Sequence, residues 1–251
     1  MSEPWPFPFW IAHRGAGKLA PENTLAAFRL GARHGYTAFE CDVKLSADGV
    51  PFLLHDATLE RTTSGHGNAG DRSWNELSRL DAGRWHSPAY AGEPPASLQA
   101  VAAFLQANGF WLDLEIKPTP GTEAQTGAVV AEAVARLWHG HERLPLLSSF
   151  QPEALRAARD SVPRLQRALL LDELPADPLA LARELRCSAV ITDHRLMDAS
   201  LLARLHAAGL RAMVYTVNDA ARAQALQAIG LDGLVTDAVD RLGPGAGSQL
   251  R

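Results

Sequence analysis

Short apolar segments typical of β-strands alternate with longer segments of helical periodicity along almost all of the 251 residues. The strand-like segments lie at 9–12, 38–45, 50–55, 110–116, 145–149, 166–171, 188–192, 211–217 and 233–236. The helix-like segments lie at 24–34, 97–108, 122–138, 152–160, 177–185, 198–208 and 219–228. This alternation predicts a parallel sheet with helical crossovers, and the chain is long enough for a (β/α)8 TIM barrel. We therefore expect an α/β fold in which residues 1–251 form a single barrel domain.

The number of strand-like segments exceeds eight by one, and the second and third segments explain the excess. Between Asp42 and His55 the chain is too short for a crossover helix, and residues 46–49 are Ser-Ala-Asp-Gly, a typical turn sequence. We expect residues 38–55 to form a β-hairpin that extends one barrel strand. Such a hairpin would bring His55 back beside Glu40 and Asp42.

Residues 57–96 interrupt the alternation with a long irregular segment. This segment contains the polar, glycine-rich run 62–70 and several aromatic residues, and it has no clear periodicity. Long irregular segments inside a compact domain are often lids or binding loops. Because this one leaves the barrel just after His55, we expect a small inserted subdomain after the third strand, lying over the barrel mouth.

Titratable residues recur on the predicted strands and at their ends. They are His13 and Arg14, Glu40 and Asp42, His55 and Asp56, and Asp113, Glu115 and Lys117. In a parallel barrel the carboxyl ends of the strands meet at one face, and this face carries the active site in barrel enzymes. These residues are therefore the candidates for a functional site. The helices between the strands begin at plausible capping residues, which are Asn23 or Thr24, Ser97, Asp177 and Asn218.

Three acidic residues, Glu40, Asp42 and Glu115, are the candidate metal ligands. Glu40 and Asp42 are two residues apart on a strand, so their side chains share one face. Carboxylates crowded at a barrel mouth repel one another unless a cation joins them, and Mg²⁺ and Ca²⁺ prefer oxygen ligands. For any one acid alone, a solvated strand end or an ion pair is the better explanation. Three acids beside two histidines favour a divalent metal.

His13 and His55 are the candidates for proton transfer, because imidazole can act as acid or base near neutral pH. The remaining histidines are expected in the core or on the surface. Asp56 either orients His55 or begins a turn, and the sequence slightly favours the turn. Arg14 and Lys117 suit an oxyanion such as phosphate. The alternative for these two cations is a structural ion pair, Arg14 with Glu22 and Lys117 with Asp113.

Motifs that follow one another along nearly the whole chain resemble those of the glycerophosphodiester phosphodiesterase family. The matching residues are His13-Arg14-Gly15, Pro21-Glu22-Asn23-Thr24, Glu40-Cys41-Asp42-Val43, Asp48-Gly49, His55-Asp56, Leu59, Arg61-Thr62-Thr63, Gly65, Glu115-Ile116-Lys117, Ser149-Phe150, Val214-Tyr215-Thr216-Val217-Asn218 and Asp232-Gly233-Leu234-Val235-Thr236-Asp237. No single motif is specific, but the ordered set is. The resemblance implies a barrel with a small inserted subdomain, a divalent metal, and hydrolysis of glycerophosphodiesters to sn-glycerol 3-phosphate and an alcohol.

The residues and the resemblance together predict a metal-dependent phosphodiesterase. The assigned roles are Glu40, Asp42 and Glu115 as ligands of Mg²⁺ or Ca²⁺, His13 and His55 as general acid and base, and Arg14, Lys117 and Tyr215 as substrate contacts. The nucleophile is either water or the neighbouring glycerol hydroxyl. Lysophospholipase D or phosphoinositide-type phospholipase activity is an alternative. A non-catalytic barrel that binds glycerophosphodiesters is a second one, but no histidine or ligand acid is missing.

Charge and hydropathy narrow the expected partners. The net charge of −4 gives no reason to expect nucleic acid. No apolar run is long enough for a transmembrane helix, and the start of the chain does not resemble a targeting segment. We therefore expect a cytoplasmic protein without stable membrane insertion, either a monomer or a homodimer. The last stretch, 243–248, is expected to be a frayed tail.

Overall fold

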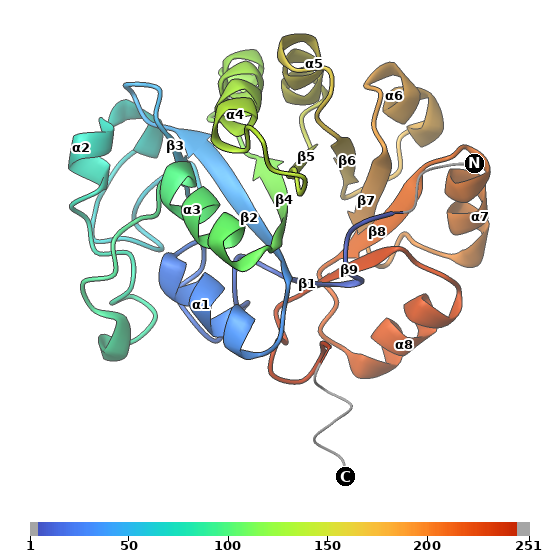
Figure 1. The fold of residues 1–251 in the computed structure, drawn as a ribbon, viewed down its shortest axis with the longest axis horizontal. Helices are drawn as coiled ribbons and strands as arrows, with labels where there is room; N and C mark the ends of the chain where they lie inside the picture. The colour runs from blue at the N-terminus through green and yellow to red at the C-terminus, as the bar shows by residue number, and fades with distance from the viewer. Residues whose placement is uncertain (1–4, 245–251) are drawn as a thin grey trace.

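Eight parallel strands close into a barrel in the computed structural model, which describes residues 5–244 (Figure 1). With the antiparallel strand β3, the strands are β1 (Trp10–Ala12), β2 (Ala38–Leu45), β3 (Pro51–Leu53), β4 (Trp111–Ile116), β5 (Leu146–Ser149), β6 (Arg167–Leu171), β7 (Ala189–Asp193), β8 (Arg211–Tyr215) and β9 (Gly233–Thr236). The barrel order is β1, β9, β8, β7, β6, β5, β4, β2, and the pairing of Ala12 with Phe39 closes the circle between β1 and β2. The predicted TIM barrel is confirmed.

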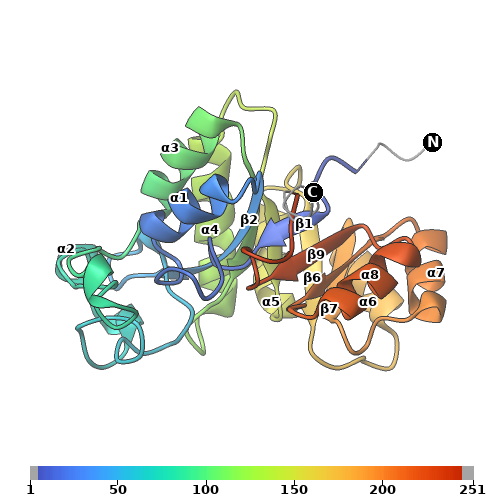
Figure 2. The same cartoon turned by 90° about the horizontal axis from the view of Figure 1, so that it is seen from below.

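Helices surround the barrel, and each parallel crossover contains one (Figures 1 and 2). They are α1 (Leu25–Arg33), α3 (Leu98–Asn108), α4 (Glu123–Leu137), α5 (Pro152–Ser161), α6 (Pro178–Glu184), α7 (Ala199–Ala207) and α8 (Ala220–Ala228). The side chains of Thr24, Ser97 and Asp177 cap α1, α3 and α6 as predicted. The predicted cap Asn218 is wrong, because Asp219 accepts the Arg222 amide at the start of α8.

No helix within residues 5–244 is long and apolar enough to cross a membrane. The predicted cytoplasmic location, the expected absence of a nucleic-acid partner and the choice between monomer and homodimer stay predictions. Of the expected tail, residues 245–248 lie outside the described part of the chain.

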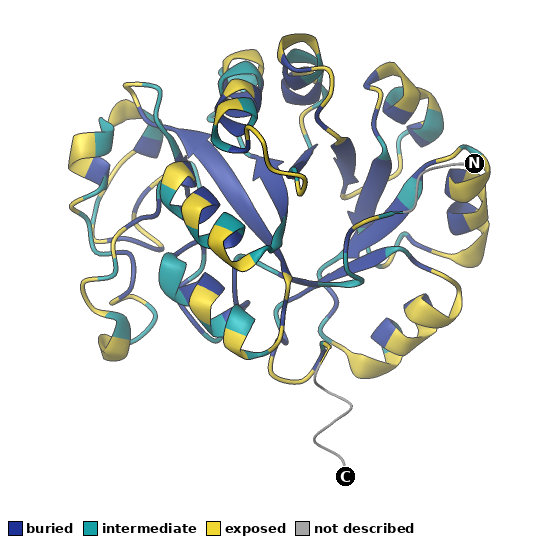
Figure 3. Cartoon of the chain, in the orientation of Figure 1, coloured by how far each residue is buried: buried dark blue, intermediate teal, exposed yellow. Residues whose placement is uncertain are grey.

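Buried apolar side chains fill the barrel interior and the layer between the sheet and the helices. Figure 3 shows that the strands are mostly buried and that the helices are exposed on their outer side. The interior is packed by residues that alternate along the strands, including Ile11, Ala168, Ile191, Met213 and Val235. Every residue of β2 is buried, because the strand has neighbours on both faces. Charged side chains of β2 that point inward at its carboxyl end are therefore held away from bulk water.

The hairpin prediction is confirmed, because β3 pairs antiparallel with β2 and Val43 lies opposite Leu53. The irregular segment 57–96 follows this hairpin and contains the 3-10 helices η1 (Ala69–Asp71) and η2 (Pro88–Tyr90) and the short helix α2 (Trp74–Leu77). Leu59, Ala69 and Leu77 of this segment form a small apolar cluster with Phe52 of β3 and the adjacent Leu54. Figure 1 shows α2 at the edge of the molecule beside β3. Near the barrel, a ring nitrogen of His86 lies 3.0 Å from the Lys18 carbonyl oxygen in the loop after β1. That this segment covers the barrel mouth stays a prediction.

Candidate active site

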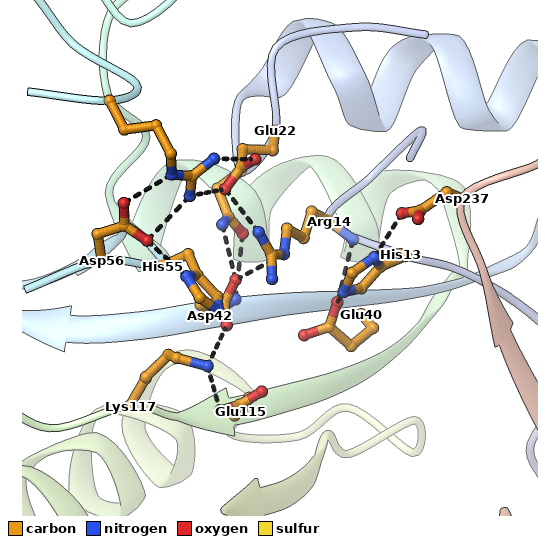
Figure 4. Close-up of polar contacts among 12 residues, drawn as sticks. His13, Arg14, Glu22, Glu40, Asp42, His55, Asp56, Glu115, Lys117 and Asp237 are labelled. Atoms are coloured by element: carbon orange, nitrogen blue, oxygen red, sulfur yellow. Dashed lines mark hydrogen bonds and ion pairs between the residues drawn. The ribbon is translucent and has the colours of Figure 1, made fainter. Parts of the chain in front are cut away.

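Most candidate residues gather at the carboxyl ends of β1, β2 and β4 (Figure 4). His55 joins them from the end of the hairpin after β3, and Tyr215 lies at the carboxyl end of β8. They line a cavity of about 210 Å³, whose wall includes His13, Arg14, Glu40, His55, Glu115, Lys117 and Tyr215. Asp42 is buried among them, with a relative exposure of 1%. The barrel thus brings every predicted site residue into one cluster, although they are spread over two hundred positions of the sequence.

Glu40, Asp42 and Glu115 lie close enough together to share one cation. The parallel register of β2 and β4 places Asp42 opposite Glu115 and Glu40 opposite Asp113. One carboxylate oxygen from each of Glu40, Asp42 and Glu115 lies within 4.8 Å of the other two. All three side chains are buried. Three hard oxygen donors at this spacing fit a divalent cation such as Mg²⁺ or Ca²⁺.

The electrostatics of the acids also favour a cation. Burial, followed by the charge of Asp42, raises the pKa of Glu115 to about 7. The same two causes raise the pKa of Glu40 well above its usual range. Burial would raise the pKa of Asp42 too, but Arg14 and Lys117 hold it below its usual range. In the absence of a metal, protons therefore compete for the site that a cation would neutralise.

Arg14 and Lys117 face the cavity while each binds carboxylates. Arg14 Nη1 donates to Glu22 Oε1 at 2.8 Å, as the structural alternative predicted, and Arg14 Nε lies 3.3 Å from Asp42 Oδ2. Lys117 Nζ lies 2.9 Å from Glu115 Oε1 and 3.5 Å from Asp42 Oδ1. The alternative pair of Lys117 with Asp113 is wrong.

Asp113 has a different partner, because its carboxylate accepts the Ser148 hydroxyl at 2.6 Å. In the strand register Asp113 on β4 pairs with Leu146 on β5 and Ser148 pairs with Glu115, so Ser148 is on the same face two residues further along and reaches Asp113 diagonally. Lys117 is thereby left beside the candidate metal ligands. Tyr215 lines the opposite wall of the same cavity, where its ring packs edge-to-face against Phe150.

His13 is oriented by a carboxylate from the other end of the chain. Its Nδ1 lies 2.6 Å from Asp237 Oδ1, and its Nε2 lies 3.7 Å from Glu40 Oε2. Asn218 fixes Asp237, because its side chain donates to Asp237 Oδ2 at 3.0 Å and accepts the Asp237 amide at 2.9 Å. Asn218 therefore supports the site instead of capping a helix. The arrangement leaves His13 Nε2 facing the acidic cluster.

His55 is oriented by its neighbour in the sequence. Its Nδ1 lies 2.7 Å from Asp56 Oδ1, so Asp56 takes the orienting role that the sequence favoured less. Arg61 in turn holds Asp56, with Nε 2.6 Å from Asp56 Oδ2. Burial lowers the pKa of His55 against the opposing effect of Asp42, which favours the neutral imidazole.

The loop after β1 supports Asp42 through an unusual backbone. Arg14 and Asn23 have φ angles of 48° and 60°, the left-handed region that few side chains adopt. Asn23 Nδ2 donates to Asp42 Oδ2 at 2.8 Å, and Asn23 Oδ1 accepts the Asp42 amide at 3.1 Å. Gly17 approaches the backbone just after β9 so closely that an added Cβ would lie 2.1 Å from the Asp237 carbonyl oxygen. The loop is therefore held beside Asp42 through Asn23 and beside Asp237 through Gly17.

Four supporting residues were missed as site residues by the sequence analysis: Asn23, Arg61, Asn218 and Asp237. All four lie inside segments that resemble the family motifs, which is the signal that could have pointed to them. Their polar side chains gave no indication of their partners, because these contacts depend on loop conformation and on the closure of the barrel.

Comparison with known proteins decides the family. The sequence pattern of the glycerophosphoryl diester phosphodiesterase family matches residues 13–241. The chain belongs to this family. YhdW of Bacillus subtilis is 31% identical over 236 residues, which cover 92% of this chain and 94% of that protein. The glycerophosphodiester phosphodiesterase of Caldanaerobacter subterraneus is 29% identical over 231 residues, with coverage of 90% and 93%.

A solved structure extends the similarity to three dimensions. A phosphodiesterase of Oleispira antarctica, determined in complex with the product sn-glycerol-3-phosphate, superposes with a TM-score of 0.89. Its sequence is 33% identical, and the match covers 96% of each chain. The present chain is accordingly an enzyme of the same kind, a glycerophosphodiester phosphodiesterase, and the cluster at the barrel mouth is its candidate active site.

Proposed function

We propose that this phosphodiesterase hydrolyses glycerophosphodiesters to sn-glycerol 3-phosphate and an alcohol, with a divalent cation and with His13 and His55 as general acid and base. The placement of these two imidazoles on either side of one carboxylate cluster carries the proposal (Figure 4). Arg14 and Lys117 line the same cavity, so groups for proton transfer and for phosphate binding converge there.

The proposed cation ligands are Glu40, Asp42 and Glu115, and Mg²⁺ and Ca²⁺ both suit these oxygen donors. When bound, the cation supplies positive charge that neutralises the phosphate during cleavage. Arg14 and Lys117 would bind the other phosphate oxygens. Arg14 supports this role, because it lines the cavity and a guanidinium carries several donors that suit phosphate oxygens.

The histidines would move the protons of the reaction through Nε2. Each Nδ1 is held by a carboxylate, Asp237 for His13 and Asp56 for His55, which fixes the ring and leaves Nε2 free to exchange a proton. One imidazole accepts the proton of the nucleophile as its oxygen bonds to phosphorus. The other donates a proton to the alcohol oxygen as the bond from that oxygen to phosphorus breaks.

The proposed nucleophile is the 2-hydroxyl of the glycerol, because its tether to the phosphate gives it a high effective concentration. Its attack would expel the alcohol and form a cyclic phosphate, which water then opens with the histidines in exchanged roles. A substrate without the 2-hydroxyl distinguishes this route from direct attack by water. An undiminished rate on that substrate would exclude the cyclic intermediate while leaving the histidine roles intact.

We also propose that the inserted segment 57–96 contacts the alcohol that leaves. Trp85 and His86 of this segment line a second hollow together with His13 and Arg14, so the hollow adjoins the reaction site. Shortening residues 64–90 to a tight turn should change the order of preference among alcohols more than it changes barrel stability. An unchanged order would make the segment purely structural.

The proposed function is tested by an activity panel on the purified protein. Metal-free enzyme is supplied with Mg²⁺ or Ca²⁺ and assayed for glycerol 3-phosphate on glycerophosphocholine, glycerophosphoethanolamine, glycerophosphoglycerol and glycerophosphoinositol. On a lysophospholipid it is assayed for the acylated glycerol phosphate. Release of glycerol 3-phosphate from the deacylated substrates is the expected result. Activity on the lysophospholipid alone would support the lysophospholipase D alternative, and activity on none of them would refute the proposal.

A further inference from the structure

Arg61 joins two carboxylates that come from different parts of the chain. Its Nε and Nη2 lie 2.6 and 3.0 Å from the two oxygens of Asp56, just after β3. Its Nη1 and Nη2 lie 2.9 and 2.8 Å from the two oxygens of Glu22, in the loop after β1. Arg61 itself belongs to the inserted segment 57–96, so one guanidinium connects three segments.

Each of the two carboxylates also binds one residue of the reaction centre. Asp56 Oδ1 lies 2.7 Å from His55 Nδ1, and Glu22 Oε1 accepts Arg14 Nη1 at 2.8 Å (Figure 4). Arg61 therefore contacts the proposed acid or base His55 through Asp56 and the proposed phosphate ligand Arg14 through Glu22. No contact of Arg61 with the cavity itself is needed for it to influence both.

The geometry requires an arginine in particular. A single exposed ion pair is worth little, and the Arg61 side chain is 44% exposed. This guanidinium, however, meets both oxygens of two carboxylates, and such forked contacts fix orientation as well as charge. A lysine would supply the charge but only one donor centre, so it could not hold Glu22 and Asp56 in the same geometry.

We propose that Arg61 is a positioning residue that sets His55 through Asp56 and Arg14 through Glu22 at the same time, and so couples proton transfer to phosphate binding. This inference rests on the proposed roles of His55 and Arg14. Variants of the two carboxylates test the two connections separately. Asp56→Asn should mainly lower kcat, and Glu22→Gln should mainly raise KM, whereas Arg61→Gln should do both.

The test is a kcat and KM measurement on glycerophosphodiester with the cation present, for wild type and these three variants. For Arg61→Gln we expect kcat to fall about 10-fold and KM to rise about 10-fold, the size typical of residues that support a catalytic group indirectly. In the double variant Asp56→Asn with Arg61→Gln, kcat should be no lower than in the less active of the two single variants, because Arg61 acts on His55 through Asp56. Arg72→Gln is the matched control, because Arg72 is an exposed arginine of the same segment whose Nη1 lies 3.7 Å from Glu76 Oε1.

Arg61→Lys separates positioning from a general effect on folding. It keeps the positive charge, so its melting temperature should stay near that of the wild type while kcat and KM shift as in Arg61→Gln. Wild-type kcat and KM in Arg61→Lys would overturn the inference, as would a change in only one of the two constants. If the wild type itself releases no glycerol 3-phosphate from any substrate, the proposed function fails. An active wild type with unaffected Arg61 variants refutes the positioning role alone.

Discussion

The two histidines of the site have the same immediate partner but are supported in different ways. Each Nδ1 meets an aspartate, at 2.6 Å in the His13–Asp237 pair and 2.7 Å in the His55–Asp56 pair. His13 and Asp237 stand 224 positions apart and meet because β1 and β9 are neighbours in the barrel. His55 and Asp56 are adjacent in the sequence and lie in the loop that leads into segment 57–96.

The two pairs also differ in exposure and in what fixes them. The side chains of His13 and Asp237 are each 17% exposed, whereas those of His55 and Asp56 are 29% and 28% exposed. Asn218 holds Asp237 from within the barrel, whereas Arg61 holds Asp56 from the inserted segment. One imidazole is thus fixed by the closed barrel and the other by a loop, so changes in the insert should affect mainly the His55 side.

The largest effect is expected from removing the proposed cation, which both histidines would depend on. Chelation should reduce turnover to background, because both histidines would act on a phosphate bound at the Glu40, Asp42 and Glu115 site, and Mg²⁺ or Ca²⁺ should restore it. Asp42→Asn should weaken cation binding in a titration calorimeter while the circular dichroism spectrum stays unchanged. Full turnover after exhaustive chelation, with no metal detected by elemental analysis, would contradict the assignment.

Removal of either imidazole should cause the next largest loss of turnover. His13→Ala and His55→Ala are each expected to lower kcat by about 10²–10⁴-fold with little change in substrate affinity, since each removes one proton-transfer step. His206→Ala is the control, because His206 also pairs with an aspartate, Asp232, but on the surface. A variant that keeps kcat within a few-fold of wild type would remove that histidine from the mechanism.

The aspartates probe the difference between the two sides directly. Asp237→Asn should lower kcat by about 100-fold and Asp56→Asn by about 10-fold, because water can replace the more exposed Asp56 more easily than the enclosed Asp237. Asp160→Asn, at an exposed carboxylate paired with Arg159, serves as the control. Equal losses in the two variants would mean that the barrel and the loop support their histidines equally well.

The smallest effect concerns stability with pH in the metal-free protein. Burial raises the pKa of both Asp113 and Glu115 to about 7, so between their unfolded pKa values and pH 7 the folded state holds more protons than the unfolded state. The free energy of unfolding from these two acids should therefore fall as pH rises from about 5 to 8. Differential scanning fluorimetry should show a melting temperature that declines by a few degrees.

His55 contributes to the free energy of unfolding in the opposite direction, because its lowered pKa makes the folded state bind fewer protons than the unfolded state near pH 6. The variant Asp113→Asn separates the contribution of Asp113 from that of His55. The decline should be shallower in Asp113→Asn, and added Mg²⁺ should flatten it in the wild type. A metal-free wild type whose melting temperature changes with pH in the same way as that of Asp113→Asn would show that Asp113 titrates normally.

Much of the fold was predictable because its signals are local. Strand and helix periodicity, the turn at 46–49 and the lack of room for a crossover were enough to place the hairpin and to bring His55 beside Glu40 and Asp42. The same period-two argument placed the side chains of Glu40 and Asp42 on one face. These expectations depend only on the spacing of residues along the chain, which can be read directly from the sequence.

The contacts that the sequence could not supply depend on register and on chain closure. The partner of Asp113 is Ser148 and not Lys117, because β4 and β5 pair in a register that no local pattern specifies. Asn218 looked like a helix cap, since asparagine favours that position, but its side chain binds Asp237, which follows the neighbouring strand β9. Residues that support a site from a distance are therefore the hardest to predict from a single sequence.

The pairing of β1 with β9 has a consequence for synthesis. The ribosome produces His13 near the start of the chain and Asp237 near its end, so His13 waits for its carboxylate until the last strand inserts between β1 and β8. Until then both strands present unpaired backbone edges, and such long-range parallel pairing is slow to form. A nascent chain stopped before β9 would already contain all three carboxylates of the proposed cation site and yet lack the partner of His13. His13 would therefore lack its orienting carboxylate, and full turnover would begin only with the final closure of the barrel.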